Sequence, residues 1–153
     1  MALKGKLEFE VKLKANADQF YQTLRRQSHE IPRMSSDKVQ GVHIQKEDGK
    51  SKGSVKKWDY TLDREEISAT ETIEAADDSK KMITFKIMDG EIMKAFKNFK
   101  TTAQAIPKEE GCLVKWILEY EKRSQNIPDP VDYRELATKI CRDMDGHLAA
   151  NFN

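Results

Sequence analysis

Cysteine is scarce in this sequence, with only Cys112 and Cys141 among 153 residues. The two form no CxxC pair and no closely spaced framework, so we expect reduced thiols rather than a disulfide scaffold or a zinc site. An excess of one charge is also missing, because 27 lysines and arginines are balanced by 26 aspartates and glutamates, for a net charge of +1. This balance argues against partners chosen by bulk electrostatics, such as nucleic acid or an anionic membrane.

Long apolar segments are absent too. The first ten residues, MALKGKLEFE, lack the apolar run of a secretory signal. No segment approaches the roughly 18 consecutive apolar residues of a membrane-spanning helix. We therefore expect a cytoplasmic protein without stable membrane insertion. Internal repeats and long linkers are missing as well, which predicts a single domain over residues 1–153.

The motifs that would fix a reaction are also missing. The sequence contains no GxSxG elbow, no HExxH motif and no P-loop, and no cluster of ligand residues indicates a metal site. The loop from Gly49 to Gly53 holds two glycines, but it lies between predicted strands and not before a helix N-terminus. We predict a turn there and no bound nucleotide.

What the sequence does contain is regular periodicity. Residues 7–13 alternate apolar and polar side chains, which predicts a half-buried strand. Helical spacing follows over residues 17–24, with Asn16 as N-cap. Pro32 interrupts any continuation, so residues 28–34 are predicted to form a second short helix or a bend.

Six more strands are predicted after these helices, joined by turns without intervening helices, which indicates an antiparallel meander. Their expected ranges are 38–47, 54–62, 66–75, 81–88, 93–106 and 112–122.

A long helix is predicted at the end, with Asp129 as N-cap and Pro130 at the first helical position. Apolar residues then recur at spacings of three and four up to Leu148, which is typical of an amphipathic helix of about 20 residues. Its inner positions are Tyr133, Leu136, Ala137, Ile140, Met144, His147 and Leu148. Helix and sheet would each cover the apolar face of the other, which gives an α+β fold.

A curved sheet around one helix leaves space that the helix does not reach, and such pockets are typically apolar. Met88, Met93 and Met144 are adaptable side chains that suit the wall of such a pocket. On the pattern alone, the plainer interpretation is that these are ordinary core residues.

A family resemblance favours the cavity. The segments that carry it are GKLE at 5–8, His29 with Ile31 and Pro32, DKVQGV at 37–42, GSVKKWDY at 53–60, IPK at 106–108, LVKWILEYEK at 113–122, PDP at 128–130 and DMDGHL at 143–148. In their order and spacing the sequence resembles the plant major latex proteins, a branch of the birch pollen allergen superfamily.

The resemblance implies a helix-grip fold, in which a curved seven-stranded antiparallel sheet wraps around the long C-terminal helix and encloses an apolar cavity. It implies a hydrophobic plant compound as the partner, such as a terpenoid, alkaloid, sterol or hormone. Some relatives are enzymes that isomerise or cyclise such compounds without a cofactor, so no cofactor is expected. An exposed edge strand could support a weak dimer, and we expect a monomer or a weak dimer.

The residues expected to line the cavity are mostly apolar or aromatic. They are Phe9, Trp58, Tyr60, Ile73, Phe85, Ile87, Met93, Phe99, Tyr133, Ala137, Ile140 and Met144. Tyr133, at the start of the last helix, is expected to act as a gate. His29 is expected near the entrance, and His43 is expected to face solvent.

Four residues are candidates for acid–base chemistry: His147, Glu71, Lys56 and Tyr60. His147 titrates near neutrality but could equally be an inert, hydrogen-bonded residue at the cavity end. Lys56 would have a lowered pKa if buried, although the plainer interpretation is an exposed strand lysine. Glu71 shares its strand face with apolar residues and is either a general base or one half of an ion pair with Lys56.

Three functions are compatible with these observations. The first is a carrier of a hydrophobic metabolite, and the second is a cofactor-free cyclase or isomerase that uses the four polar candidates. The third is a signalling module with a protein partner, for which Ile92, Met93 and Phe96 could supply an exposed apolar loop.

Overall fold

The computed structural model describes residues 3–150. Its elements in chain order are β1 (Lys4–Leu13), α1 (Ala17–Arg26), η1 (Ser28–Glu30), α2 (Ile31–Met34), β2 (Val39–Lys46), β3 (Val55–Leu62), β4 (Glu65–Asp77), β5 (Met82–Gly90), η2 (Glu91–Lys94), β6 (Phe96–Pro107), β7 (Cys112–Lys122) and α3 (Val131–Ala150).

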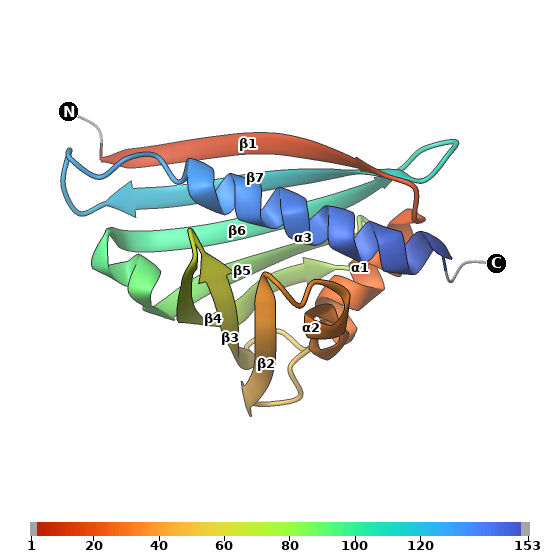
Figure 1. Cartoon of the computed structure of the whole chain (residues 1–153), viewed down its shortest axis with the longest axis horizontal. Helices are drawn as coiled ribbons and strands as arrows, with labels where there is room; N and C mark the ends of the chain where they lie inside the picture. Colours follow the sequence, from red (N-terminus) through yellow and green to blue (C-terminus); the bar gives the residue numbers. More distant parts are fainter. Residues whose placement is uncertain (1–2, 151–153) are drawn as a thin grey trace.

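One antiparallel sheet contains all of these strands, in the order β1-β7-β6-β5-β4-β3-β2. Strands β2 to β7 follow one another as a meander, and β1 closes onto β7. Figure 1 shows α3 lying across the sheet, with β2 and β3 steeply inclined to β6 and β7. The predicted α+β helix-grip fold, with two short helical segments after the first strand, is confirmed.

Two β-bulges interrupt the pairing between β4 and β5. Glu71 pairs with Ile87 directly after Thr70 pairs with Asp89, and a second shift lies between Ile73 and Ala75. Bulges bend a strand and increase its twist. Both shifts therefore add curvature near the middle of the sheet.

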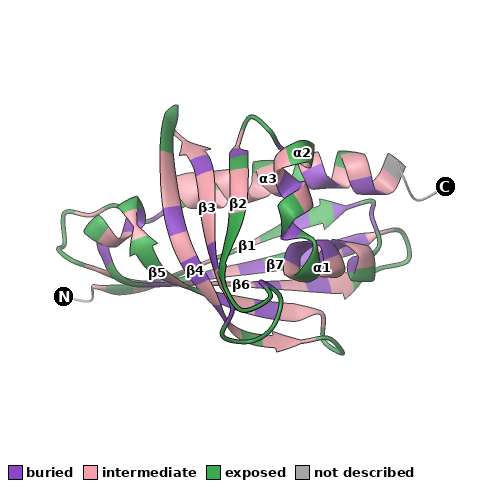
Figure 2. Cartoon of the chain, turned by 90° about the horizontal axis from the view of Figure 1, so that it is seen from below, coloured by how far each residue is buried: buried purple, intermediate pink, exposed green. Residues whose placement is uncertain are grey.

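Two apolar clusters fill the concave side of the sheet. The larger packs α1 and the C-terminal half of α3 against β1, β6 and β7. The smaller is aromatic, with Phe96, Phe99 and Tyr120 in edge-to-face and stacked contacts. Figure 2 shows that exposed residues gather on the edge strand β2 and on the loops.

Some predicted boundaries were wrong. Met93 was expected in a strand, but it lies in the 3-10 helix η2, and β6 begins only at Phe96. Helix α3 begins at Val131, where Arg134 N donates to Pro130 O. Asp129 does not cap it with its side chain, because that carboxylate accepts from Tyr120 Oη at 3.0 Å and pairs with Lys122 Nζ at 2.8 Å.

The last turns of α3 are tied to the chain that links β1 to α1. The carboxylate of Asp145 accepts hydrogen bonds from Lys14 N at 3.0 Å and Ala15 N at 2.8 Å. Asp143 accepts a further bond from Ser35 Oγ at 2.7 Å. These contacts hold the C-terminal part of α3 in its position on the sheet.

Candidate functional site

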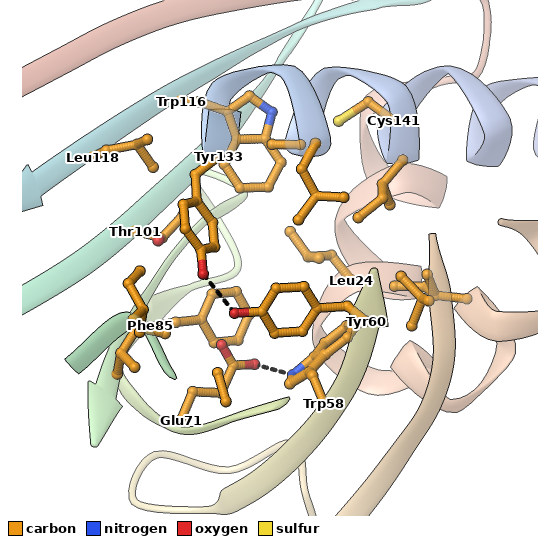
Figure 3. A pocket seen from close by; sticks show the side chains of 18 of the residues that line it. Leu24, Trp58, Tyr60, Glu71, Phe85, Thr101, Trp116, Leu118, Tyr133 and Cys141 are labelled. Atoms are coloured by element: carbon orange, nitrogen blue, oxygen red, sulfur yellow. Dashed lines mark hydrogen bonds between the residues drawn. The ribbon is translucent and has the colours of Figure 1, made fainter. Parts of the chain in front are cut away.

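An apolar cavity lies between the sheet and α3. About 160 Å³ of it is open to the centres of water molecules, whereas a single buried water needs about 10–15 Å³ by that measure. The cavity is therefore large enough for a small organic molecule. Its walls come from α1, α2, α3 and the strands β2 to β7 (Figure 3).

Most of the residues predicted to line the cavity do so. They are Trp58, Tyr60, Phe85, Ile87, Phe99, Tyr133, Ala137, Ile140 and Met144, together with the candidate Glu71. One face of β3 carries the side chains of Lys56, Trp58 and Tyr60, and this face points into the molecule. The choice of Lys56 and Tyr60 as acid–base candidates requires this orientation.

Three predicted lining residues lie elsewhere. Ile73 is buried in the larger apolar cluster, and Met93 packs against the aromatic cluster from η2. Phe9 stands behind the wall, where its ring stacks on that of Trp116 with centroids 6.1 Å apart. Their apolar character was predicted correctly, but periodicity does not distinguish the core from the surface of a cavity inside it.

The histidines take no part in the cavity. His147 is half-buried on α3, beyond Met144, which is the last residue of that helix to line the cavity. It shares the helix face predicted from the spacing, but the helix extends past the cavity. His29 is exposed on η1, and His43 is exposed as predicted, with Nε2 2.8 Å from Asp59 Oδ2.

Glu71 is the carboxylate in the cavity wall, and its side chain accepts a hydrogen bond from Trp58 Nε1 (Figure 3). The residue is only 8% exposed. Burial raises the pKa of Glu71 to about 7, and the neighbouring Lys56 charge and the Trp58 hydrogen bond offset a part of that rise. The group therefore exchanges its proton near neutral pH.

Lys56 is 1% exposed, so its interpretation as an exposed strand lysine was wrong. Its Nζ donates to Ser28 Oγ at 2.8 Å and lies 5.6–5.7 Å from the ring centroids of Phe85 and Trp58. Burial lowers the pKa of Lys56, and the charge of Glu71 offsets a part of that decrease. Within residues 3–150 the ammonium forms no ion pair with Glu71, and it lies behind the cavity wall.

Two tyrosine hydroxyls join the sheet to α3 across the cavity. Tyr60 Oη on β3 lies 2.6 Å from Tyr133 Oη on α3, and both side chains line the cavity (Figure 3). Burial raises the pKa of Tyr60 to about 12 and also raises the pKa of Tyr133. Both hydroxyls therefore stay protonated at neutral pH. One donates to the other, and the hydrogen of the accepting hydroxyl is free to donate to a ligand.

Tyr60 also borders a second, polar cleft, together with Asp59, Glu66 and Glu91. The tyrosine pair thus stands between the cavity and an acidic cleft. This position fits the predicted gate role of Tyr133, which stays a prediction.

Sequence reasoning missed about half of the wall. The missed residues are Phe20, Leu24, Ile31, Val39, Ala69, Ile92, Thr101, Trp116, Leu118, Leu136 and Cys141. Trp116 and Leu118 lie on the apolar face of β7, so period two along residues 112–122 could have identified them. The residues of α1 and α2 could not be found in this way, because only the fold brings those helices over the cavity.

The expected exposed apolar loop was also wrong. Ile92 and Phe96 are each 5% exposed, and Met93 is partly buried. Their side chains pack against Phe99 and its neighbours instead of facing solvent. The segment therefore gives no support to docking of a protein partner.

No group of three or more histidine, cysteine, aspartate or glutamate side chains within residues 3–150 could hold a metal ion. Within the same part of the chain, no helix combines the length and the apolar character needed to cross a membrane.

Comparison with known proteins agrees with the fold. MLP-like protein 28 from Arabidopsis thaliana is 36% identical over 97% of this chain, which spans about half (45%) of that relative. MLP-like protein 43 from the same plant is 35% identical, with 97% of this chain and 96% of the relative covered. The crystal structure of major latex-like protein 151 from Panax ginseng superposes with a TM-score of 0.92 at 29% identity, covering 95% and 98% of the two chains.

A more distant neighbour shares the fold alone. Norcoclaurine synthase from Thalictrum flavum superposes with a TM-score of 0.81 at 13% identity, covering 98% and 97% of the two chains. The family description "Pathogenesis-related protein Bet v 1 family" matches residues 2–151, nearly the whole sequence. The chain therefore belongs to the Bet v 1 family, and its relatives there are major latex proteins.

Proposed function

We propose that this chain binds a small hydrophobic plant metabolite in the cavity, as a carrier or in defence and specialised metabolism. Terpenoids, alkaloids, sterols and hormones are the candidate classes. The observation that carries the proposal is the cavity itself, whose wall is mostly apolar and aromatic with a few polar groups such as Glu71, Tyr60 and Tyr133. Ligand sites commonly combine an apolar wall with a few orienting polar groups.

A binding titration tests this function. The neutral fluorescent probe N-phenyl-1-naphthylamine is titrated into the protein and then displaced by terpenoids or sterols. Ala137→Phe, which fills the cavity from α3, should lower the affinity about tenfold or more. Glu135→Phe is the matched control, because Glu135 is exposed on the same helix. Equal affinities for the wild type and Ala137→Phe would place the probe outside the cavity and overturn the proposal.

A second candidate is a cofactor-free cyclase or isomerase, and Glu71 is the observation that favours it. A carboxyl group that exchanges its proton near pH 7 and lines an apolar cavity has the properties of a general base. The free hydroxyl hydrogen of the Tyr60–Tyr133 pair would be donated to a carbonyl or hydroxyl oxygen of the substrate. The shared fold of norcoclaurine synthase supports only the point that this architecture can hold an enzyme.

Glu71→Gln separates the two candidates. Glutamine keeps an acceptor for Trp58 Nε1 but cannot take a proton. For an enzyme, turnover should fall about 10²- to 10⁴-fold while the affinity stays within a few-fold. The wild-type rate should rise with pH through about 7, because the carboxylate is the active form. Turnover that is unchanged in Glu71→Gln would rule out this base, and the absence of turnover would leave the carrier.

Two further expectations belong to the proposal. A cytoplasmic location would suit a carrier of intracellular metabolites. The edge strands β1 and β2 each pair on one side only in the sheet of residues 3–150, and we expect a monomer or a weak dimer that forms through such an edge.

A further inference from the structure

Trp116 carries a polar group that nothing in the described chain satisfies. Its side chain lines the cavity from β7 and is only 8% exposed. Its Nε1–H nevertheless has no hydrogen-bond partner among residues 3–150. Buried polar groups are nearly always paired, so an unpaired one needs an explanation.

The other tryptophan provides an internal comparison. Trp58 lines the same cavity, but its Nε1–H donates to Glu71. The sequence contains two tryptophans, so one indole N–H of this cavity is paired within the protein and the other is not. Figure 3 shows the two indoles well apart, with Trp116 near α3 and Trp58 beside Glu71.

The orientation of the Trp116 indole is fixed by its neighbours. Phe9 faces Trp116 across the β1–β7 ladder, and their rings stack with an interplanar angle of 6°. In Figure 3 the indole nitrogen is directed toward the part of α3 that carries Cys141, which also lines the cavity. The donor is therefore held in one direction before any ligand arrives.

The thiol of Cys141 is the nearest internal candidate for an acceptor. Burial raises the pKa of Cys141 to about 12, and the neighbouring Trp116 N–H offsets a part of that rise. Cys141 therefore remains a neutral thiol, which is a weak acceptor. The contact of the indole N–H with this thiol lowers the pKa of Cys141 but does not meet the geometry of a hydrogen bond, so a neutral oxygen would be the better acceptor for it.

The charge of the wall restricts what could satisfy this donor. In the described part of the chain, no lysine or arginine lines the cavity. The carboxyl of Glu71 already accepts the hydrogen bond of Trp58 Nε1. The amino group of Lys56 lies behind the wall at the Trp58 end, 5.7 Å from the centroid of that ring, so an anionic group beside Trp116 would find no cationic side chain in the wall. A neutral oxygen acceptor on an apolar molecule would find a donor in apolar surroundings.

We propose that Trp116 Nε1–H forms a second polar subsite of the cavity, which binds a carbonyl or other neutral oxygen of the ligand. This inference rests on the proposed function and narrows it to oxygenated apolar compounds. A ligand with a second polar group could then contact the Glu71, Tyr60 and Tyr133 side at the same time.

A matched pair of probes tests the subsite. Cyclohexyl methyl ketone and ethylcyclohexane have nearly the same shape and differ by a carbonyl in place of a methylene. Each is titrated into ¹⁵N-labelled protein, and the two indole N–H signals are followed by NMR. The signal missing from Trp116→Phe identifies Trp116, and that variant keeps the aromatic stack with Phe9.

The ketone should move the Trp116 indole proton downfield, and the hydrocarbon should not. Trp116→Phe should lower the affinity for the ketone about 2- to 10-fold and leave that for the hydrocarbon within about twofold. If both probes bind in the cavity and shift the Trp116 signal equally, the subsite is refuted while the cavity function stands. If neither moves any cavity signal, the proposed function fails and the subsite fails with it.

Discussion

The carboxyl group of Glu71 is removed from water when the protein folds, so its titration changes the stability of the protein with pH. Its pKa is raised from the ordinary 4.5 to about 7, chiefly by burial. Between these values the folded state holds a proton that the unfolded chain has released. The free energy of unfolding should therefore fall by about 3 kcal/mol as the pH rises through this range.

Glu71→Gln should remove this fall, because glutamine does not titrate. Urea denaturation of both proteins from pH 4 to 8 measures it, and the difference between the two curves cancels the other titrating groups. Parallel curves over the whole range would show that the Glu71 carboxyl keeps its ordinary pKa in the folded protein.

Ser28 is the hydrogen-bond acceptor for the buried Lys56 ammonium, at 2.8 Å. Ser28→Ala leaves that charge without its acceptor in a site that water does not reach, so it should destabilise the protein by about 1–3 kcal/mol. Ser36→Ala, at an exposed serine of the same region, should change the stability by less than about 0.5 kcal/mol. Thermal and urea unfolding of the two variants provide the comparison, and equal stabilities would contradict the buried contact.

At the scale of single residues, the sequence identified important side chains better than it predicted what surrounds them. Glu71 was recognised because a carboxylate in an apolar row is unusual, and the row is indeed buried. For Lys56 the sequence left two interpretations open, a buried acid–base candidate and an exposed strand lysine. The contact with Ser28 that distinguishes them joins residues 28 positions apart. The unpaired N–H of Trp116 has no signal in the sequence at all.

At the scale of elements, Gly111 controls how β7 begins beside the end of β1. Its φ is +79°, and a β-carbon there would lie 2.0 Å from the carbonyl oxygen of Leu13. Gly53 has a similar φ of +89° but nothing within 4 Å of such an atom. A side chain at Gly53 would therefore cause backbone strain alone, whereas one at Gly111 would cause the same strain together with a steric clash.

Gly53→Ala should cost about 1–2 kcal/mol for its left-handed backbone alone. Gly111→Ala should cost about 3 kcal/mol or more, because the β1–β7 pairing must shift as well. Denaturant unfolding measures both, and similar losses in the two variants would mean that the clash is relieved without disturbing the strands.

Strands and helices were predictable where one face is buried, because periodicity reports that face directly. The last strand was predicted at 112–122 and lies at Cys112–Lys122. The register shifts between Thr70 and Glu71 and between Ile73 and Ala75 were not predictable, since the strand sequence continues without interruption while its pairing shifts. The short helix η2 was missed because Met93 was interpreted as the start of an apolar strand.

At the scale of the whole molecule, the central claim is that sheet curvature and the fixed position of α3 leave a cavity that holds a ligand. The family resemblance predicted such a cavity, but its volume depends on bulges and on tertiary contacts such as Asp145 with Lys14 and Ala15. These contacts join residues about 130 positions apart, so no local pattern contains them.

Native mass spectrometry of the protein from its source tissue tests that claim most directly, with the released compound identified before and after incubation with the protein. We predict a stoichiometric, oxygenated apolar compound, which Ala137→Phe would no longer retain. Its recovery unchanged would support the carrier, and an isomerised or cyclised product formed faster than in a protein-free control would support the enzyme. A protein that carries nothing and takes up no apolar compound would contradict the account.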